Sequence, residues 1–323
     1  MTNNVLYYPY IRVPNNDWFT RVLLYWDTVG SIVPYEYVMN PETLGPHMGS
    51  LLTEGLVKHV VPADYLHRVP NFTEAFVQRA EQFRAQHNLK PGSLANLPTF
   101  RIHIEKLEYI GNILCEMGLA RKSKYPWYEI EGRLADIFMA YLAGVLSNLP
   151  EVESHPITDT SDQLSLYESP EMIRTLVLDE LLPAPSGGVP ASDLSRFKSK
   201  NKKLLINFRS QIESFIILAG SIPELAARKE LVGRFLGHAK AEIDNIVDAM
   251  KSHGWTKISN GRFFTYTATG AALADAIATG GLLTTIAAAF GTAASAYTTY
   301  RETRLPDAFQ NSFVAYAALA KNL

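Results

Sequence analysis

Short apolar runs alternate with amphipathic segments along the first part of the chain, and this alternation constrains the fold more than any other feature. Runs with strand character are expected at residues 5–13, 56–61, 100–104, 155–158 and 175–182. Strands that alternate with helices are typical of βαβ units, whose strands pair in parallel. The sequence therefore predicts a mixed α/β protein whose N-terminal domain contains a small, largely parallel sheet.

Helices with an apolar period of 3.6 residues are expected between these runs. Asn15 and Asn16 can cap the first helix, which is predicted to continue to Pro34. Others are predicted to begin at Asn71, after residue 104 and at Pro126. The residues predicted to face the core from these three helices include Phe72, Phe76, Ala80, Phe83, Leu107, Ile110, Leu114, Trp127, Ile130 and Phe138.

A segment rich in proline and glycine, residues 183–192 (PAPSGGVPAS), divides the chain. These residue types interrupt both helices and strands, so the segment reads as a linker. We therefore expect an α/β domain at residues 1–185 and a mainly helical domain at residues 186–323.

Long helical patterns follow the linker. One helix is predicted from Ser192 to about residue 219, and a second from the capping box at Ser221 to Gly254. Because so few residues separate them, they are expected to form a long antiparallel helical hairpin. The dipeptide at residues 260–261 (Asn-Gly) predicts the turn of a small β-hairpin after them.

Residues 266–300 form a segment of 35 residues with one charge, Asp275, and 25 Gly, Ala, Ser or Thr residues. Its length would span a bilayer, and its small residues would let membrane helices approach closely. Its five large apolar residues within 276–300 would contribute only about −1.5 to −3 kcal/mol to insertion. We therefore favour a tightly packed helical hairpin, with membrane insertion or an oligomer interface as alternatives.

The overall composition excludes some classes of function. Thirty basic residues against 32 acidic ones leave a net charge of −2, which argues against a protein that binds DNA or anionic lipid through its overall charge. A single cysteine, Cys115, excludes an internal disulfide framework and a zinc site made of paired cysteines. The opening residues show no secretory signal, so a cytoplasmic location is expected. No metal site is predicted, and no pattern identifies a cofactor.

Four residues are candidates for catalysis because they lie at or near predicted strand ends or in an apolar helix. Glu105 and Lys106 follow the strand at 100–104, and Asp159 follows the strand at 155–158. Together with Asp27, they could position a phosphoryl group if their side chains converge. The structural alternatives are a surface ion pair between Glu105 and Lys106, a helix cap at Asp159 and a solvated or buried Asp27.

A basic cluster after the linker is a candidate binding surface for phosphate or nucleic acid. Its residues are Arg196, Lys198, Lys200, Lys203 and Arg209. A row of cations near the start of a helix could hold a phosphate backbone. The alternative is an ordinary solvated helix face.

The amino-acid sequence resembles a bacterial protein family that is described only as a domain of unknown function. The motifs that carry the resemblance are residues 6–9 (LYYP), Trp18, 23–27 (LLYWD), 104–106 (IEK), the helix at 135–143 with Tyr141, 158–159 (TD) and 207–209 (NFR). The resemblance implies a bacterial, intracellular protein and transfers no activity.

These observations favour a protein that takes part in an interaction or an assembly. We add the hypothesis that it is a component of a bacterial stress or phage-defence system. The expected partner is another protein or a second copy of the chain, with nucleic acid less favoured. One alternative is a phosphate- or nucleic-acid-directed enzyme, and another is an effector that acts on membranes through residues 266–300. Whether the chain is an enzyme stays open at this point.

Overall fold

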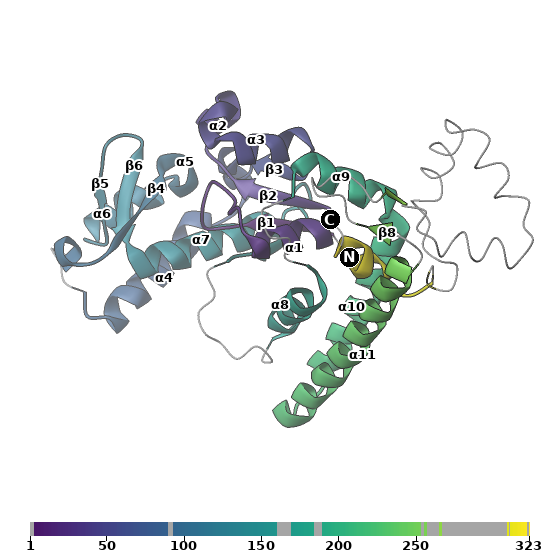
Figure 1. Cartoon of the computed structure of the whole chain (residues 1–323). Helices are drawn as coiled ribbons and strands as arrows, with labels where there is room; N and C mark the ends of the chain where they lie inside the picture. The colour runs from purple at the N-terminus through teal and green to yellow at the C-terminus, as the bar shows by residue number, and fades with distance from the viewer. Residues whose placement is uncertain are drawn as a thin grey trace, which may run out of the picture. The chain divides into compact units, whose positions relative to one another are not determined.

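The computed structural model describes residues 3–89, 93–159, 169–183, 189–252, 255–256, 265–266, 309, 311–321 and 323. The fold is mixed α/β, as predicted, and the chain divides into two compact units (Figure 1). The first unit comprises Met1–Asn15 and Trp26–Ser161, and the second comprises Asn16–Tyr25 and Asp162–Leu323. Except for its first residue, the small-residue segment at 266–300 lies outside the described residues. Within the described part, no helix has both the length and the apolar character needed to cross a bilayer.

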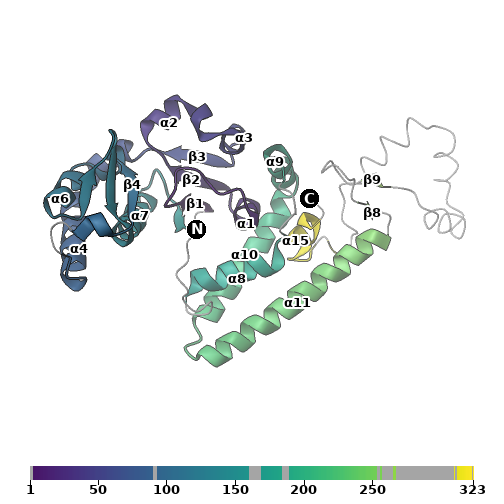
Figure 2. The same cartoon turned by 60° about the vertical axis from the view of Figure 1, so that its left-hand side comes forward.

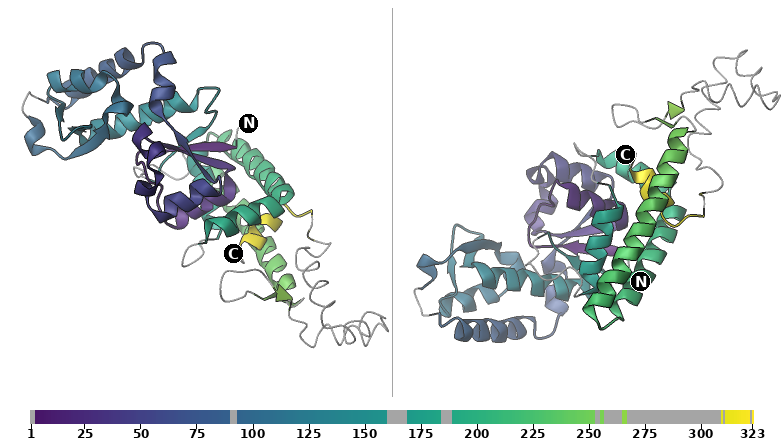
Figure 3. Two further views of the ribbon diagram at one scale, coloured as in Figure 1. Left: turned by 90° about the horizontal axis from the view of Figure 1, so that it is seen from above. Right: turned by 60° about the horizontal axis from the view of Figure 1, so that its bottom comes forward.

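The first unit contains a parallel sheet, drawn in purple for most of its strands in Figure 3. Its strands are β1 (Asn4–Tyr7), β2 (Thr28–Ile32), β3 (Val57–Val60) and β7 (His155–Ile157), in the order β3-β2-β1-β7. All three neighbouring pairs are parallel. The strands predicted at 5–13, 56–61 and 155–158 are therefore confirmed, although each is shorter than its predicted range.

Strand β2 corrects the first predicted helix, which was expected to continue to Pro34. The helix α1 (Asp17–Tyr25) ends earlier, and Val29 lies on a strand that pairs with both β1 and β3. Pairing on both sides satisfies backbone groups that a helix would have satisfied internally, so tertiary contacts decide the outcome. The strand packs closely at Gly30, where a Cβ atom would lie 2.9 Å from Cδ1 of Leu6.

A second, antiparallel sheet completes the first unit. Its strands are β4 (Thr99–His103), β5 (Ala120–Lys122) and β6 (Trp127–Glu131), in the order β4-β6-β5. The strand predicted at 100–104 is confirmed, but the helix predicted from Pro126 is wrong at its start. Trp127 and Ile130 lie on β6, and the helix begins at Gly132, where the Glu131 carboxylate accepts a hydrogen bond from the Leu134 N–H (2.8 Å).

Both sheets share one apolar core with the helices α4 (Phe72–Gln86), α5 (Ile104–Leu107), α6 (Ile110–Glu116) and α7 (Gly132–Ser147). The helices α2 (Tyr35–Met39) and α3 (Pro46–Thr53) also belong to the first unit. The predicted apolar stripe of α4 is buried, and the rings of Phe76 and Phe138 meet edge to face at 5.0 Å. The single helix predicted after residue 104 is instead two, because Glu108 has a φ of 47° that interrupts it.

The second unit is helical (Figure 2). Its elements are α1, α8 (Pro170–Leu181), α9 (Ala191–Lys200), α10 (Lys202–Gly220), α11 (Leu225–Ser252), α15 (Ala315–Ala320) and the strands β8 (Trp255–Thr256) and β9 (Thr265–Tyr266). The predicted hairpin of long helices is confirmed, with Phe215 of α10 stacked on Phe235 of α11 at 3.8 Å. Strands β8 and β9 pair antiparallel, while the predicted turn at 260–261 lies outside the described residues.

Two predictions for the second unit are wrong. Residues 175–182 were expected to form a strand, but all except the last belong to helix α8, which Ser169 caps through the Met172 N–H (3.2 Å). The helix expected from Ser192 to about residue 219 is divided at Asn201. The Asn201 amide donates to the Phe197 carbonyl at 2.9 Å, a local bond that competes with continuation of the helix.

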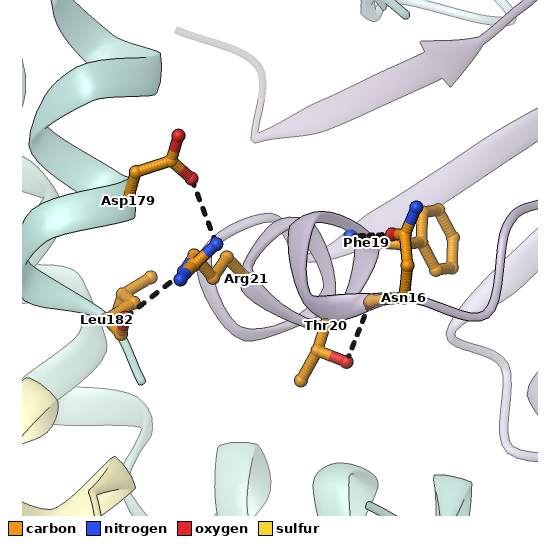
Figure 4. A network of polar contacts seen from close by, with 6 residues as sticks. All are labelled: Asn16, Phe19, Thr20, Arg21, Asp179 and Leu182. Atoms are coloured by element: carbon orange, nitrogen blue, oxygen red, sulfur yellow. Dashed lines mark hydrogen bonds and ion pairs between the residues drawn. The ribbon is translucent and has the colours of Figure 1, made fainter. Parts of the chain in front are cut away.

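Polar contacts join α1 to α8, although these helices are far apart in the sequence (Figure 4). Asn16 caps α1 by accepting from the Phe19 N–H at 2.9 Å, as predicted. Arg21 donates to the Asp179 carboxylate at 3.1 Å and to the Leu182 carbonyl at 3.2 Å. These contacts place residues 16–25 with the C-terminal helices, so the division differs from the boundary predicted between residues 185 and 186.

Aromatic side chains form the centre of the second unit. Phe208 of α10 meets the ring of Tyr25 at 6.1 Å and the ring of Tyr316 at 6.0 Å. The Tyr316 hydroxyl donates to the backbone oxygen of Leu24 at 2.7 Å, and the Tyr25 hydroxyl donates to Glu213 at 2.7 Å. Residues 24–25 of α1 and Tyr316 of α15, which are far apart in the sequence, are thus held in one core.

Two glycines offer a test of the packing in the first unit. A Cβ atom at Gly111 of α6 would lie 2.9 Å from the ring of Tyr128, whereas nothing lies within 4 Å of one at Gly144 of α7. The hydroxyl of Tyr128 is held by Asn112 at 2.9 Å, so the ring cannot move freely. We expect Gly111→Ala to lower the free energy of unfolding by about 1–2 kcal/mol through overpacking. Gly144→Ala should raise it by about 0.5–1 kcal/mol through helix propensity.

Urea unfolding followed by circular dichroism measures both variants. Both substitutions replace a helical glycine by alanine, so the difference between them isolates the contact with the Tyr128 ring. Equal changes in the two variants would contradict the described packing of α6 against β6.

Candidate functional site

A cavity of about 450 Å³ lies in the first unit. Its wall is built from residues 9–12, which follow β1, from Tyr37 of α2, from residues 100–103 of β4, from Lys106 of α5, and from β6 and α7. Cavities that hold small ligands have volumes of about 300–1,000 Å³. The volume is therefore suited to a small molecule rather than to a single ion.

Lys106 places a cation in the wall of this cavity. The residue is only 3% exposed, because α5 follows β4 directly and its last residues pack into the core. Burial lowers the pKa of Lys106 to about 7, since a surrounding of low polarity disfavours the ammonium form. Burial is the cause of this decrease in the pKa, and no ion pair with a carboxylate of the described residues offsets it, as a buried cation normally requires.

His103 lies at the end of β4, in the same wall, and is also 3% exposed. Its Nδ1 accepts a hydrogen bond from the backbone N–H of Glu105 at 3.2 Å, so the neutral ring carries its proton on Nε2. Burial lowers the pKa of His103, with a further decrease from Lys106 and opposition from Glu105 and Glu36. The Nε2 atom is 3.5 Å from Glu36 and makes no hydrogen bond within the described part of the chain. The ring is thus a neutral donor at pH 7.

Two arginines add positive charge to the wall. Arg12 donates to the backbone oxygen of Thr43 at 2.6 Å, which fixes the loop after β1. Arg101 lies 3.6 Å from Glu129 and keeps a side chain that is 66% exposed. One carboxylate, Asp136 of α7, also lines the cavity. Guanidinium groups match the geometry of phosphate and carboxylate, so Arg12 and Arg101 can bind an anion.

Aromatic side chains form the rest of the wall. They come from Tyr10, Tyr37, Phe100 and Trp127. The Trp127 ring meets the His103 ring edge to face at 5.2 Å, whereas Tyr10 and Phe100 are 49% and 45% exposed. Exposed aromatic faces stack on flat rings. The cavity can therefore hold a compound that combines an anionic group with an aromatic or apolar part.

The structure separates the two adjacent residues Glu105 and Lys106. Lys106 lines the cavity, whereas Glu105 accepts a hydrogen bond from the backbone N–H of Tyr35 at 2.6 Å. The surface ion pair that was the alternative is not formed, because Lys106 is buried.

Asp27 and Asp159 do not join Lys106 in one site. Asp27 precedes β2 and Asp159 follows β7, while β1 pairs in parallel with both strands. The two carboxylates therefore lie at opposite ends of the parallel strands: Asp27 at the amino ends and Asp159 at the carboxyl ends. Asp159 accepts a hydrogen bond from the Tyr7 hydroxyl at 3.0 Å, and burial together with this carboxylate raises the pKa of Tyr7. The four candidates therefore do not converge, although the phosphate-directed alternative required this of them.

The basic cluster after the linker is divided between two helices. Arg196 and Lys200 belong to α9, whereas Lys203 belongs to α10, beyond the interruption at Asn201. A continuous helical stripe of cations, as expected from the sequence, is therefore not formed.

The other two residues of the basic cluster are buried. Lys198 is 9% exposed and Arg209 is 6% exposed. Arg209 donates from Nε to the backbone oxygen of Tyr25, and its guanidinium lies 5.7 Å from the centre of the Tyr25 ring. Arg209 thus stabilises the core of the second unit and is not available to a phosphate.

Three basic residues of the cavity were not among the candidates: Arg12, Arg101 and His103. A signal for each was present. Arg12 follows a parallel strand, where ligand-binding groups gather. Arg101 and His103 are two residues apart on a strand, so their side chains leave the same face. That these residues lie in the same cavity as Lys106 could not be predicted, because it depends on how the chain folds after β4.

No metal site is found in the described part of the chain, where no three His, Cys, Asp or Glu residues lie close enough to hold an ion. Comparison with protein-family models, with curated proteins and with solved structures finds no match. The chemistry of the cavity is therefore the evidence on which a function can be argued.

The buried charge of Lys106 predicts a pH-dependent effect of its removal on stability. The pKa of Lys106 falls from its ordinary value of about 10.4 to about 7 on folding, so the unfolded chain binds more protons between these pH values. The stability of the wild type should therefore gain from this group as the pH rises. We expect Lys106→Met to be more stable than the wild type at pH 6–7, with a difference that decreases toward pH 9.

Urea unfolding at pH 6, 7, 8 and 9 measures this difference. Lys122→Met is the matched control, because Lys122 is an exposed lysine on β5 of the same unit. A difference for Lys106→Met that stays constant over this range would show that the amine is not buried as a titrating cation.

Proposed function

We propose that the first unit binds a small phosphorylated compound that carries an aromatic ring, in the cavity lined by Arg12, Arg101, His103 and Lys106. The observation that carries this proposal is the buried, uncompensated amine of Lys106 in the wall of a cavity that is large enough for such a ligand. A buried cation without a counter-ion lowers stability, and such local costs are typical of functional sites. A bound anion would supply the missing negative charge.

The neighbouring residues support the same class of ligand. Arg12 and Arg101 are suited to the phosphate, and the Nε2–H group of His103 can donate to one of its oxygens. The rings of Trp127 and Phe100 provide apolar surface for the remainder. This proposal belongs with the phosphate-directed alternative from the sequence, but it relies on a different set of side chains.

An interaction or assembly role remains a second proposal. It is supported by apolar side chains on α10 that are more than half exposed, namely Ile206, Ile217 and Leu218. Exposed apolar side chains can contribute to a protein interface. Light scattering of the purified chain tests it, and a monomer at all concentrations would contradict self-assembly.

The hypothesis of a stress or phage-defence role rests on the family resemblance and on residues 266–300, and unchanged phage sensitivity after loss of the protein in its native host would contradict it.

Adenosine 5′-monophosphate is a suitable probe of the cavity. Calorimetry at pH 6 should show binding to the wild type, and Lys106→Met should weaken it about 10- to 100-fold, as expected for the loss of one charge-assisted contact. The pKa of Lys106 is about 7, so the advantage of the wild type over the variant should decrease as the pH rises to 8.5. Comparing the two proteins at each pH cancels the titration of the phosphate itself.

Two controls make this experiment specific. Adenosine, which lacks the phosphate, should bind more weakly than the monophosphate to the wild type. Lys122→Met removes an exposed lysine and should bind like the wild type. Equal affinity of Lys106→Met and the wild type for the monophosphate at pH 6 would contradict the proposal.

A further inference from the structure

We infer that Lys106 forms an imine with an aldehyde or ketone that carries a phosphate group. This inference rests on the proposed anion site and names the reactive group of its ligand. The argument comes from the position of the side chain in the cavity and from the groups around it.

A lysine must be neutral and accessible to a ligand to attack a carbonyl carbon. Lys106 is 97% removed from solvent, belongs to the wall of a 450 Å³ cavity, and forms no ion pair within the described part of the chain. Near neutral pH, the lowered pKa of Lys106 leaves a large fraction of the amine unprotonated. A lysine with the ordinary pKa of its side chain remains almost fully protonated at the same pH.

The surrounding residues suit this reaction. Arg12 and Arg101 can hold the anionic group of the ligand, which limits the carbonyl carbon to a few positions in the cavity. His103 is neutral, and its Nε2 proton has no acceptor among the described residues. An imidazole in this state can donate its Nε2 proton to the carbonyl oxygen, and the same nitrogen can then accept a proton from the lysine nitrogen.

The chemical step is a condensation that needs no oxidant or reductant. The Lys106 nitrogen forms a bond to the carbonyl carbon, and the carbonyl oxygen becomes a hydroxyl by taking a proton. The carbon–oxygen bond then breaks, and the oxygen leaves as water with both protons of the amine. His103 transfers these protons and ends in its initial state. The product is an imine between Nζ and the ligand.

Reductive trapping tests this inference. The full-length protein is incubated with a limiting amount of pyridoxal 5′-phosphate at pH 8, reduced with borohydride, and mapped by peptide mass spectrometry. We expect label on Lys106 to exceed label on any other lysine by about tenfold or more, because its neutral fraction is far larger. Adenosine 5′-monophosphate should reduce this label by competing for the cavity, and pyridoxal without phosphate should react more slowly.

Variants and pH give independent readouts. Label at this site should be absent from Lys106→Met and unchanged in Lys122→Met, with circular dichroism confirming that both are folded. The labelling rate at Lys106 should rise between pH 6 and 8 and then level off, whereas exposed lysines should continue to gain reactivity toward pH 10.

The possible failures of the two proposals are distinguishable. Label spread over exposed lysines with none on Lys106, while the monophosphate still binds, would overturn the imine and leave the anion site in place. Failure of both labelling and monophosphate binding would overturn the anion site as well.

Discussion

The first unit depends on the burial of β1 between two parallel neighbours. Every backbone N–H and C=O group of a buried strand needs a partner, and β1 finds its partners in β2 and in β7. Strand β7 follows all other elements of this unit, and the segment between β3 and β7 contains the second, antiparallel sheet. The cavity lies where residues 9–12, after β1, meet β4 and α7.

The charge balance of this cavity is unusual for a protein interior. A buried lysine normally has a carboxylate partner, because the ammonium group loses its hydration without compensation. Lys106 has a lowered pKa with burial as its sole cause, and His103 beside it is also held neutral by burial. The two arginines retain contact with solvent or with backbone oxygens. This arrangement supports the proposal of a ligand that brings negative charge.

Much of the fold could be predicted from local sequence patterns, and much of the site could not. The apolar stripe of α4 and the strands β1, β3, β4 and β7 followed from period and turn residues. Strands β2 and β6 were mistaken for helix, since Val29, Trp127 and Ile130 also fit a helical stripe and only pairing with distant strands decides between them. Of the four candidate catalytic residues, Lys106 alone lines the cavity.

By itself, the sequence determined the α/β class, the helical hairpin of α10 and α11, and the presence of a lysine directly after β4. These properties depend on periodicity and on neighbours along the chain, which are local. The tertiary structure alone decided that Asp27 and Asp159 lie at opposite ends of the parallel strands. It likewise decided that Arg209 is buried in the core of the second unit. It also decided that Arg12, His103 and Lys106 surround one cavity. Burial and charge compensation depend on segments that are distant in sequence, so no local pattern encodes them.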